Sequence, residues 1–411
     1  MERISRRKVL KTAGALAAMY ILNPGELLLQ ASEGLDTSKK IRVGIVGGGF
    51  GCMFPWHLHP NVVVTGVTDL RQDRRDRMVK YFKCEKAYDS LEIMLDKSAR
   101  DFDAIAVFSG APDHLKHSVM CLEKGLHVIC AVPACWTLAE CDVLRNAVEK
   151  SGKNYMMAET SYYHPALIAA RQWYQEGKFG NIFFTEAEYF HAGMEYSLWR
   201  DKDGKPTWRF GNPPMHYPTH CTSFLIGLTG ERLTEVSCLG WGDGDPIMEG
   251  NPGNNPYWNE VALFRTNRGN ALRVAMFKRG AFGGCERAQW YGDKMSFFER
   301  SPNGLGHFTR TSGQDYEKDG GGYDSKRATK EDWTPPDYAR QFLPEALEPA
   351  FGKGHAGSEV FLVHEFIESI VRNREPLINV YEALAYTAPG FVAHQSALKG
   401  GIQLPVPQFD R

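Results

Sequence analysis

The chain has 411 residues, of which 43% are hydrophobic and 24% are charged. This is the composition of a globular protein, and the length predicts two domains with ample apolar material for their cores. The formal net charge of −1 excludes a broad electrostatic attraction to nucleic acid or to an anionic membrane surface, so we expect neither as a partner.

Residues 1–35 have the features of an export signal and linker. Arg6 and Arg7 precede a short, mildly apolar stretch in the sequence SRRKVLKTAGALAAMYILNPG. The pattern is typical of a twin-arginine signal, and a basic amphipathic helix is the alternative. The apolar stretch is too short to span a bilayer. We therefore expect a periplasmic or otherwise exported protein without a membrane partner after export, and we leave this segment out of the fold.

Residues 36–160 alternate short apolar runs with amphipathic stretches. The apolar runs are almost continuously hydrophobic, as strands buried on both faces are: IRVGIVG, NVVVTGVTD, FDAIAVFSG, LHVICAVP and NYMMAE. The stretches between them have helical character: RQDRRDRMVKYF, SLEIMLDKS, HLKHSVMCLEKG and LAECDVLRNAVEKSG. Alternating strands and helices predict an α/β Rossmann domain with a parallel sheet and right-handed crossovers.

A glycine-rich loop follows the first of these strands. Gly47 and Gly49 fill the first two positions of the dinucleotide-binding pattern G-x-G-x-x-G, and Cys52 stands at the third. Asp69 ends the second strand, 22 residues after Gly47 (69 − 47), where a carboxylate binds the ribose hydroxyls. Asp69 would repel a 2′-phosphate, so the pattern favours NAD over NADP, although Arg71 keeps NADP as an alternative. A glycine-rich turn without a ligand is the other alternative.

Residues 161–411 read as a second, α+β domain. Several longer strands, some joined by tight Gly turns, predict a large, mainly antiparallel open sheet: NIFFTEAEYFHAG, LTEVSCLGWG, NEVALFRTNRG, NALRVAMFKRG and RAQWYGDKMSFFE. Residues 302–356 are rich in Gly, Pro, Asp and Thr and are expected to form a long loop or arm. Two helices then close the chain and are expected to pack back: SEVFLVHEFIESIVRNR and YEALAYTAPGFVAHQSALKGG.

Taken together, these motifs identify a resemblance to the Gfo/Idh/MocA oxidoreductases over about residues 40–408. The segments that carry it are VGIVGGG, Asp69, APDHLKH, GLHVICAVP, GKFGNI, the His220 segment and REPLINVYEAL. The resemblance implies a nucleotide-binding domain, a sheet domain that forms homo-oligomers (dimers or tetramers), and sugar or polyol substrates. It also implies the residues that contact the cofactor, which are Gly47, Gly49, Phe50, Asp69, Arg71, Pro112, His114, Val132 and Pro133.

The chain departs from ordinary members of this family at their proton-handling groups. Those members carry Glu-Lys-Pro where this chain has Ala131, Val132 and Pro133. The lysine normally touches both nicotinamide and substrate, and Val132 cannot replace it. His220 falls on the family's catalytic histidine, but the aspartate four residues earlier is His216 here. The proton transfers must therefore use other groups.

The departures resemble a branch of the superfamily, glycoside hydrolase family 109, whose members hydrolyse glycosides with bound NAD. They carry Glu-Val-Pro-Ala-Ala, Tyr-Pro-Thr-His and a His-Gly-Gly-like segment. The matching stretches here are Ala131–Cys135, Tyr217–His220 and Gly354–Gly357. An aromatic after the fifth strand, Tyr163, also corresponds, whereas Ala131 replaces the branch's glutamate.

The resemblance implies oxidation of a sugar carbon, which we expect to be C3, followed by elimination, hydration and re-reduction. The alternatives are a glycoside 3-dehydrogenase with net NAD reduction and a non-catalytic NAD- or sugar-binding protein. A base with a pKa near neutrality and a phenol suffice for the proton transfers. The expected catalytic residues are His220, Tyr217, Tyr163 and His355. The expected substrate-binding residues are His216, Trp208, Arg209, Asn259 and Glu260.

Other interpretations of the same residues stay open at this point. His216 is also compatible with packing, Tyr163 with a place in the core, and His355 with a turn. No metal site is expected, because Pro218 disfavours a regular helix between His216 and His220 and no acidic residue lies in that stretch. The nine cysteines match no zinc pattern, although one disulfide remains possible. The His-x-His pair at residues 57 and 59 is better explained by packing.

Overall fold

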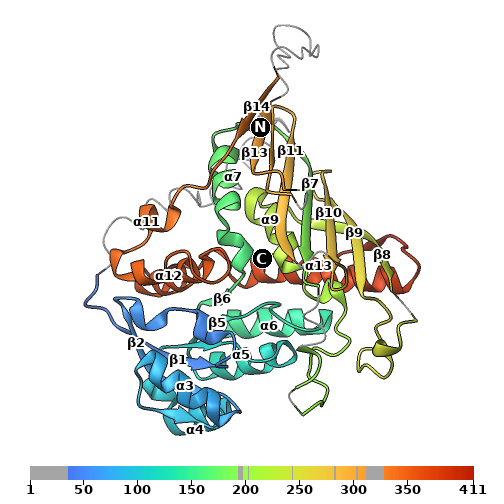
Figure 1. Ribbon diagram of the computed structural model, residues 1–411. Helices are drawn as coiled ribbons and strands as arrows, with labels where there is room; N and C mark the ends of the chain where they lie inside the picture. Colours follow the sequence, from blue (N-terminus) through green and yellow to red (C-terminus); the bar gives the residue numbers. More distant parts are fainter. Residues whose placement is uncertain are drawn as a thin grey trace, which may run out of the picture.

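The computed structural model describes residues 36–192, 198–201, 203–242, 244–281, 284–301, 304–311 and 328–411. Two sheets make up the molecule, with helices α12 and α13 between them (Figure 1). The expected export signal, residues 1–35, lies outside the described residues, so export stays a prediction. Among the helices that are described, none is long and apolar enough to cross a membrane.

The first sheet is the predicted Rossmann sheet, with six parallel strands in the order β3-β2-β1-β4-β5-β6. Its strands are β1 (Ile41–Val46), β2 (Val62–Thr68), β3 (Ala87–Tyr88), β4 (Ala104–Val107), β5 (His127–Cys130) and β6 (Tyr155–Met157). Its helices are α3 (Gln72–Phe82), α4 (Leu91–Ser98), α5 (His114–Glu123) and α6 (Leu138–Ser151). The strand order reverses between β1 and β4, and the carboxyl ends of strands at such a point form a ligand crevice.

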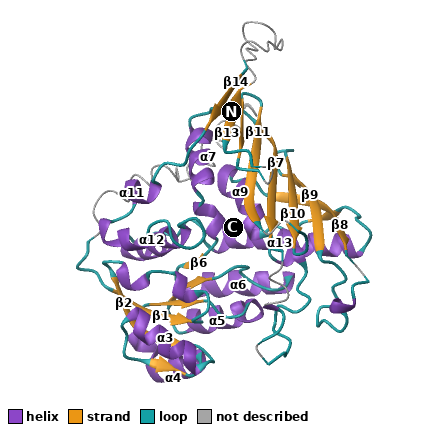
Figure 2. Ribbon diagram, viewed as in Figure 1, coloured by secondary structure: helices purple, strands orange, loops and turns teal. Residues whose placement is uncertain are grey.

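The second sheet has nine strands in the order β14-β13-β12-β11-β7-β10-β9-β8-β15. Most of them are labelled in Figure 2. The strands are β7 (Ile182–Phe190), β8 (Leu233–Trp241), β9 (Asn259–Thr266), β10 (Ala271–Phe277), β11 (Cys285–Gly292), β12 (Met295–Phe298), β13 (Phe308–Thr311), β14 (Thr329–Asp332) and β15 (Leu404–Pro405). The sheet is mainly antiparallel, as predicted, but β7 and β10 pair in parallel. This pairing inserts β7 between the hairpin β9–β10 and β11.

Helices cover one face of this second sheet. The helices of this part are α7 (Pro165–Gln175), α9 (Thr219–Thr229), α11 (Tyr338–Phe342), α12 (Ser358–Val371) and α13 (Val380–Leu398). Short 3-10 helices are η1 (Gly51–Met53), η2 (Trp56–Leu58), η3 (Ala99–Asp101), η4 (Ala111–Asp113), η5 (Thr160–Tyr163), η6 (Pro214–His216), η7 (Pro246–Met248) and η8 (Glu345–Ala350). Helix α9 packs against β7, β10 and β11, and α13 against β8 and against α6 of the Rossmann domain. The two sheets thus share a helical layer.

The segment 302–356 is more ordered in its described part than the expected loop. Strands β13 and β14 extend the sheet by pairing with β12 and with each other. Phe308 stacks on Phe298 with ring centroids 4.8 Å apart, and Trp333 packs edge-on against Phe297 at 5.2 Å. These aromatic contacts hold an edge hairpin whose short, polar strands give little sequence signal.

A buried histidine pair joins the Rossmann domain to α12. His59 and His364 lie 3.1 Å apart through Nε2 and Nδ1, and the backbone N–H of Asn61 donates to Nδ1 of His59 at 3.1 Å. His59 therefore carries its proton on Nε2 and donates it to His364. Burial lowers the pKa of His364 to about 4 and that of His59 well below its usual value.

Because both histidines have lowered pKa values, we expect the protein to lose stability in mild acid. The unfolded chain takes up a proton at each histidine near a pKa of about 6.5, whereas folded His364 stays neutral down to about 4. Between about pH 6.5 and 5 this one group should remove roughly 2 kcal/mol from the free energy of unfolding. The measurement is urea unfolding of wild type and His364→Leu at both pH values. The variant should show the smaller drop, and parallel curves would contradict the assignment.

Candidate functional site

The glycine-rich loop forms the nucleotide end of the site. Gly47 has φ = +90°, and a side chain there would overlap the carbonyl oxygen of Phe108 at the end of β4. Its N–H donates to the carbonyl of Thr68 at 2.8 Å, which ties the loop to β2. The loop therefore lies across the carboxyl ends of β1, β2 and β4, where backbone amides can approach a pyrophosphate.

Asp69 is held in place at the end of β2. Its carboxylate accepts the N–H of Gly48 at 2.8 Å and that of Arg71 at 2.9 Å, and Arg74 lies 3.6 Å away. The guanidinium of Arg71 is paired instead with Asp73 at 2.6 Å on the surface. A fixed carboxylate beside the glycine loop is what the two ribose hydroxyls of NAD require, so the residues present fit this cofactor.

Two glycine variants distinguish the role of the loop in folding from its role in cofactor binding. Gly47→Ala should destabilise the protein, because its φ is left-handed and its Cβ would meet backbone. Gly49→Val should fold normally, because the nearest atom to an added Cβ is the flexible end of Arg74, 3.3 Å away. Yet it should lose NAD binding, because its side chain would hold the pyrophosphate away. Thermal unfolding with and without NAD checks both, and an undiminished NAD-induced shift in Gly49→Val would contradict this account.

A cavity of about 320 Å³ lies between the carboxyl edge of the Rossmann sheet and the second sheet. Its lining is mainly aromatic and apolar, with several histidines. The sequence-predicted residues that line it are Phe50, His114, Val132, Trp208, Arg209, Tyr217, His220 and His355. Further lining residues include Ala131, Tyr189, His191, Trp199, Asn212, Phe277 and Lys278. The structure therefore brings three of the four predicted catalytic residues into one space with three of the nine predicted cofactor residues.

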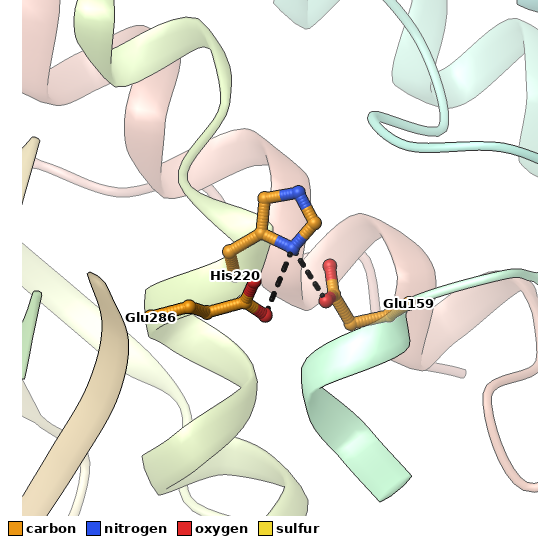
Figure 3. Close-up of side chains that lie close together, drawn as sticks. All are labelled: Glu159, His220 and Glu286. Carbon is orange, nitrogen blue, oxygen red and sulfur yellow. Dashed lines mark hydrogen bonds and ion pairs between the residues drawn. The ribbon is translucent and has the colours of Figure 1, made fainter. Parts of the chain in front are cut away.

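His220 lies at the first turn of α9, after Pro218 at the N-cap. Its Nδ1 lies 2.9 Å from Oε1 of Glu159 and 3.5 Å from Oε1 of Glu286 (Figure 3). Ser161 connects the two acids, since its N–H donates to Glu159 at 2.9 Å and its hydroxyl donates to Glu286. The second ring nitrogen, Nε2, points away from both carboxylates (Figure 3).

The charges around His220 correct the expected pKa near neutrality. Burial alone would lower the pKa of His220, but the carboxylates of Glu159 and Glu286 outweigh burial and raise it well above 6.5. Burial in turn would raise the pKa of both acids. The His220 imidazolium lowers the pKa of Glu159, and His164 together with His220 lowers that of Glu286, so each lies below its usual range. The three groups form a buried ion cluster with His220 protonated at neutral pH.

Aromatic rings fix the orientation of His220 on its cavity side. Tyr189 from β7 stacks on it with ring centroids 4.7 Å apart, and Tyr217 lies 6.2 Å away at 27°. His191 stacks in turn on Tyr189 at 5.3 Å, and burial lowers the pKa of His191 to about 4. Arg209 lies over the ring of Tyr217 at 5.3 Å. Tyr217 and His220 are thus neighbours in the cavity, as the motif predicted.

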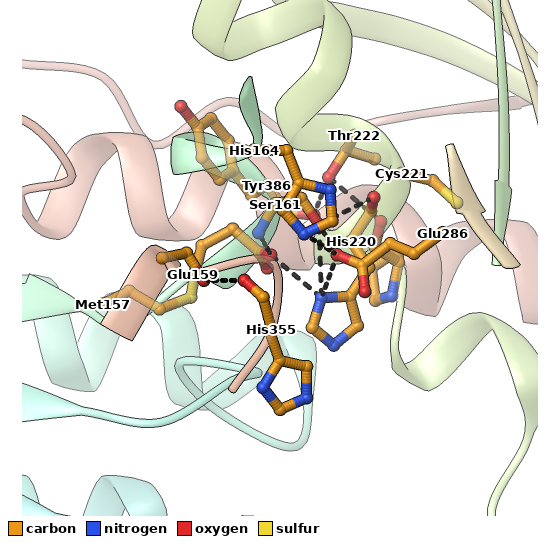
Figure 4. A network of polar contacts seen from close by, with 12 residues as sticks. Met157, Glu159, Ser161, His164, His220, Cys221, Thr222, Glu286, His355 and Tyr386 are labelled. Atoms are coloured by element: carbon orange, nitrogen blue, oxygen red, sulfur yellow. Dashed lines mark hydrogen bonds and ion pairs between the residues drawn. The ribbon is translucent and has the colours of Figure 1, made fainter. Parts of the chain in front are cut away.

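His355 enters the cavity from the loop before α12, next to the glycine loop. Its ring meets Phe50 edge-on at 5.5 Å, and its Nδ1 lies 2.7 Å from Oε1 of buried Glu359. The backbone N–H of His355 also donates to Glu359 at 2.9 Å. In Figure 4 no dashed line joins the ring of His355 to His220. His355 therefore lines the cavity beside Phe50, and its expected catalytic role stays a prediction.

His114 holds the segment that contains the cis peptide Val132–Pro133, where cofactor contacts are expected. Its Nδ1 lies 2.7 Å from the carbonyl oxygen of Pro133, and its Nε2 lies 3.1 Å from that of Ser109. Pro112 lies in η4, one turn before α5, and is outside the cavity lining. His114 therefore connects the ends of β4 and β5 on which the lining residues stand.

Three of the expected substrate-binding residues lie outside the cavity lining. His216 packs outside the cavity against Trp136 at 5.2 Å and Phe391 at 5.0 Å, and burial lowers its pKa well below the usual value. Asn259 and Glu260 also lie outside the lining. The Asn259 side chain accepts the N–H of Lys278 at 3.0 Å, which joins β9 to the end of β10.

Glu260 has a structural role instead. It is fully buried on the helix-covered face of β9, where its carboxylate lies 2.7 Å from Nδ1 of His394 in α13. It also accepts the N–H of Met215 at 2.7 Å, which holds η6 against the sheet. The polar residue Glu260 in an apolar strand thus pairs with buried His394, a partner that the sequence did not reveal.

Tyr163 is also outside the cavity. It lies in η5 and is 2% exposed, with its ring stacked on Phe361 of α12 at 5.3 Å. This position corrects the expected catalytic role, because a ring enclosed by α12 does not reach the lining. The core alternative describes Tyr163.

Sequence reasoning missed Glu159, Glu286 and Tyr189, which surround His220. Glu159 directly follows the strand end MMA and could have been noticed as an acid at the carboxyl edge of a parallel sheet. Glu286 and Tyr189 gave no such signal, because only the pairing of β7 with β10 and β11 brings them to α9.

Two family models match the chain. Residues 41–159 match the oxidoreductase family with an NAD-binding Rossmann fold, Gfo/Idh/MocA, and residues 324–411 match the C-terminal domain of glycosyl hydrolase 109. A glycosyl hydrolase family 109 protein of Solibacter usitatus is 22% identical, covering 100% of this chain and 98% of the relative. An alpha-N-acetylgalactosaminidase of Tannerella forsythia is 23% identical, covering 96% and 92%.

Solved structures share the whole two-domain fold. Levoglucosan dehydrogenase in complex with NADH and L-sorbose superposes with a TM-score of 0.72 at 17% identity, covering 90% of this chain and 99% of that chain. Scyllo-inositol dehydrogenase of Lactobacillus casei with NAD(H) and scyllo-inositol gives 0.65 at 14% identity, covering 89% and 99%. Both confirm the predicted fold class, a Rossmann domain joined to a mainly antiparallel sheet domain.

Proposed function

Since the chain belongs to the Gfo/Idh/MocA oxidoreductases, in their glycosyl hydrolase family 109 branch, we propose that this NAD-dependent enzyme oxidises C3 of a glycoside and cleaves its glycosidic bond without net redox change. The observation that carries the proposal is the shared cavity. The cavity is lined by His220 and Tyr217 and also by Val132, which follows β5 at the carboxyl edge of the NAD-binding sheet.

The residues of the cavity supply the proton transfers. The chemistry that bound NAD contributes is the removal and return of hydride. When its imidazole is neutral, His220 accepts the proton of the C3 hydroxyl at Nε2, and the phenol of Tyr217 holds the oxygen. The hydrogen on C2 is then acidic beside the ketone, so a base can remove it while the substituent on C1 leaves. Water adds to the resulting double bond, and His220 returns its proton when C3 is reduced again.

The lining also suits a sugar. Trp208, Tyr217 and Phe277 offer faces on which a pyranose ring can stack. Asn212 is 5% exposed and lines the cavity, and its Oδ1 accepts no hydrogen bond from the described residues. Such a buried acceptor calls for a donor from the substrate, and a sugar hydroxyl supplies one.

The test is a panel of 4-nitrophenyl glycosides of different sugars and anomers, incubated with NAD-loaded enzyme in deuterium oxide. The panel should include the α-N-acetylgalactosaminide, because one relative bears the name of that activity. Hydrolysis should release the free sugar with deuterium at C2 and without accumulation of NADH. Mass spectrometry and NADH absorbance provide the readouts.

Two other outcomes would redirect the assignment. A keto-sugar with one NADH formed per turnover and no deuterium at C2 would indicate a glycoside 3-dehydrogenase. Binding of sugars without any product would indicate a non-catalytic member of the family.

A further inference from the structure

The clearest feature that the proposed reaction does not yet use is the pair of buried acids behind His220. Glu159 is fully buried at the N-cap of η5. Glu286 lies in β11, and its side chain is 13% exposed. The two acids are 127 positions apart in the sequence (286 − 159), yet both direct Oε1 at the same ring nitrogen. We propose that Glu159 and Glu286 are the positioning residues of the reaction, which hold His220 by Nδ1 and leave Nε2 to exchange the proton of the sugar hydroxyl.

The argument starts from hydrogen-bond capacity. An ionised carboxylate only accepts, so the proton between Glu159 and His220 belongs to Nδ1. When His220 is neutral, its single proton therefore stays on Nδ1, and the lone pair is on Nε2. His220 lines the cavity, and Figure 3 shows Nε2 directed away from the acids. The geometry thus selects the tautomer in which the nitrogen facing the substrate is the base.

The two acids have different tasks. Glu159 Oε1 lies within hydrogen-bond distance of Nδ1 at 2.9 Å, whereas Glu286 lies at 3.5 Å and is held by the hydroxyl of Ser161. Glu286 also lies 3.5 Å from Nε2 of His164 (Figure 4). Glu159 therefore orients the ring by a hydrogen bond, and Glu286 adds a second negative charge that favours the imidazolium.

This second charge fits a reaction that takes a proton and later returns it. In the oxidation the substrate O–H bond breaks, its proton moves to Nε2, and the electron pair forms the C=O bond as hydride leaves C3 for the bound NAD+. In the re-reduction the imidazolium gives the same proton back to the oxygen. Ordinary family members place an aspartate four residues before the histidine, and this chain has His216 there. Glu159 and Glu286 supply the missing carboxylate charge from other elements.

Several groups face His220, and of these the two acids raise its pKa. They are Glu159 and Ser161 of η5, Tyr189 and His191 of β7, Tyr217 before α9, Glu286 of β11 and, through Glu286, His164. Only the two acids among them carry negative charge at neutral pH. Because the neutral imidazole is the base, activity should rise with pH above about 6.5, the ordinary pKa of histidine.

The test compares Glu159→Gln, Glu286→Gln and the milder Ser161→Ala in the NAD-loaded enzyme. Glu159→Gln should lower kcat on the cleaved 4-nitrophenyl glycoside by about 10²–10⁴-fold with little change in KM, because an amide can donate to Nδ1 and reverse the tautomer. Glu286→Gln should move the acid limb of the kcat/KM profile to lower pH, because it removes one negative charge at His220. Ser161→Ala keeps both carboxylates and should therefore move the limb much less. The matched control is Glu260→Gln, which alters the buried Glu260–His394 pair outside the cavity and should leave the profile in place.

A second readout does not depend on turnover. NMR of isotope-labelled histidine, with His220 assigned by its loss in His220→Gln, should show a proton on Nδ1 and a titration above that of free histidine, and both should change in Glu159→Gln. If this holds but no glycoside is cleaved, the positioning role stands and the proposed function fails. Unchanged pH profiles and NMR signals in the acid variants would overturn the positioning role.

One nitrogen and two carboxylates, as at His220, Glu159 and Glu286, also match the ligands of some divalent ions. We favour a proton over a metal ion between His220 and the two acids, because Glu159 and Glu286 already accept hydrogen bonds from Ser161. Treatment with EDTA should leave activity intact. A stoichiometric metal that is lost with activity in EDTA and restores it on return would overturn the proposal.

Discussion

His220→Ala is expected to lower kcat/KM for the cleaved glycoside by about 10²–10⁴-fold, the usual contribution of one general acid–base group. The substitution removes the nitrogen that exchanges the proton of the sugar hydroxyl. It leaves Gly47, Gly49 and Asp69 untouched, so NAD should bind as in wild type. Stopped assays on the 4-nitrophenyl glycoside, together with an NAD titration, measure the two quantities separately.

The control for this experiment is His216→Leu, four residues earlier. His216 packs against Trp136 and Phe391 outside the cavity, so the variant should lose some stability but keep the rate per folded molecule. The ion cluster adds a second consideration. His220→Ala leaves Glu159 and Glu286 buried without their cation, so a lower melting temperature is expected as well. Near-full activity in His220→Ala would reject the acid–base assignment.

The fold was predictable because its signals are local. Strands β1, β4, β5 and β6 are almost entirely buried and therefore form continuous apolar runs in the sequence, and Gly47 and Asp69 directly follow β1 and β2. Strands β13 and β14, with sequences FTRT and TKED, were not predictable. They are short and polar, and they form because β12 presents an open edge and the aromatic rings of Phe298 and Phe308 meet.

The candidate site was predictable only where one motif contains it. Tyr217 and His220 lie on the same turn, so a short segment places both in the cavity. The acids behind His220 come from η5 and β11, and no sequence spacing connects them to α9. Glu260 shows the opposite error, because a buried acid looks the same in the sequence whether it meets a sugar or, as here, His394, 134 positions away.

Asp69→Ser is expected to weaken NAD binding by about 10²-fold, because hydrogen bonds to a charged group contribute roughly 1.5–3 kcal/mol each and the carboxylate faces two ribose hydroxyls. Wild-type protein should release NAD, and not NADP, when it is denatured. The same variant should gain affinity for NADP. It removes the negative charge that repels a 2′-phosphate and leaves Arg74, 3.6 Å from the present carboxylate, to meet that phosphate. Calorimetric titrations with both cofactors provide the measurement.

The matched control is Asp73→Ser, which breaks the surface pair with Arg71 but leaves the Asp69–Gly48 contact intact. If Asp69 determines the cofactor, Asp73→Ser should keep the NAD affinity of wild type and its preference over NADP. If Arg71 determines it instead, Asp73→Ser should release that guanidinium and raise NADP affinity on its own. The two variants therefore distinguish two causes of NAD preference. Either the Asp69 carboxylate excludes the 2′-phosphate, or Arg71 fails to bind it because it is paired with Asp73. The backbone contacts of Asp69 favour the first, because a carboxylate fixed by Gly48 and Arg71 cannot turn away to admit the phosphate.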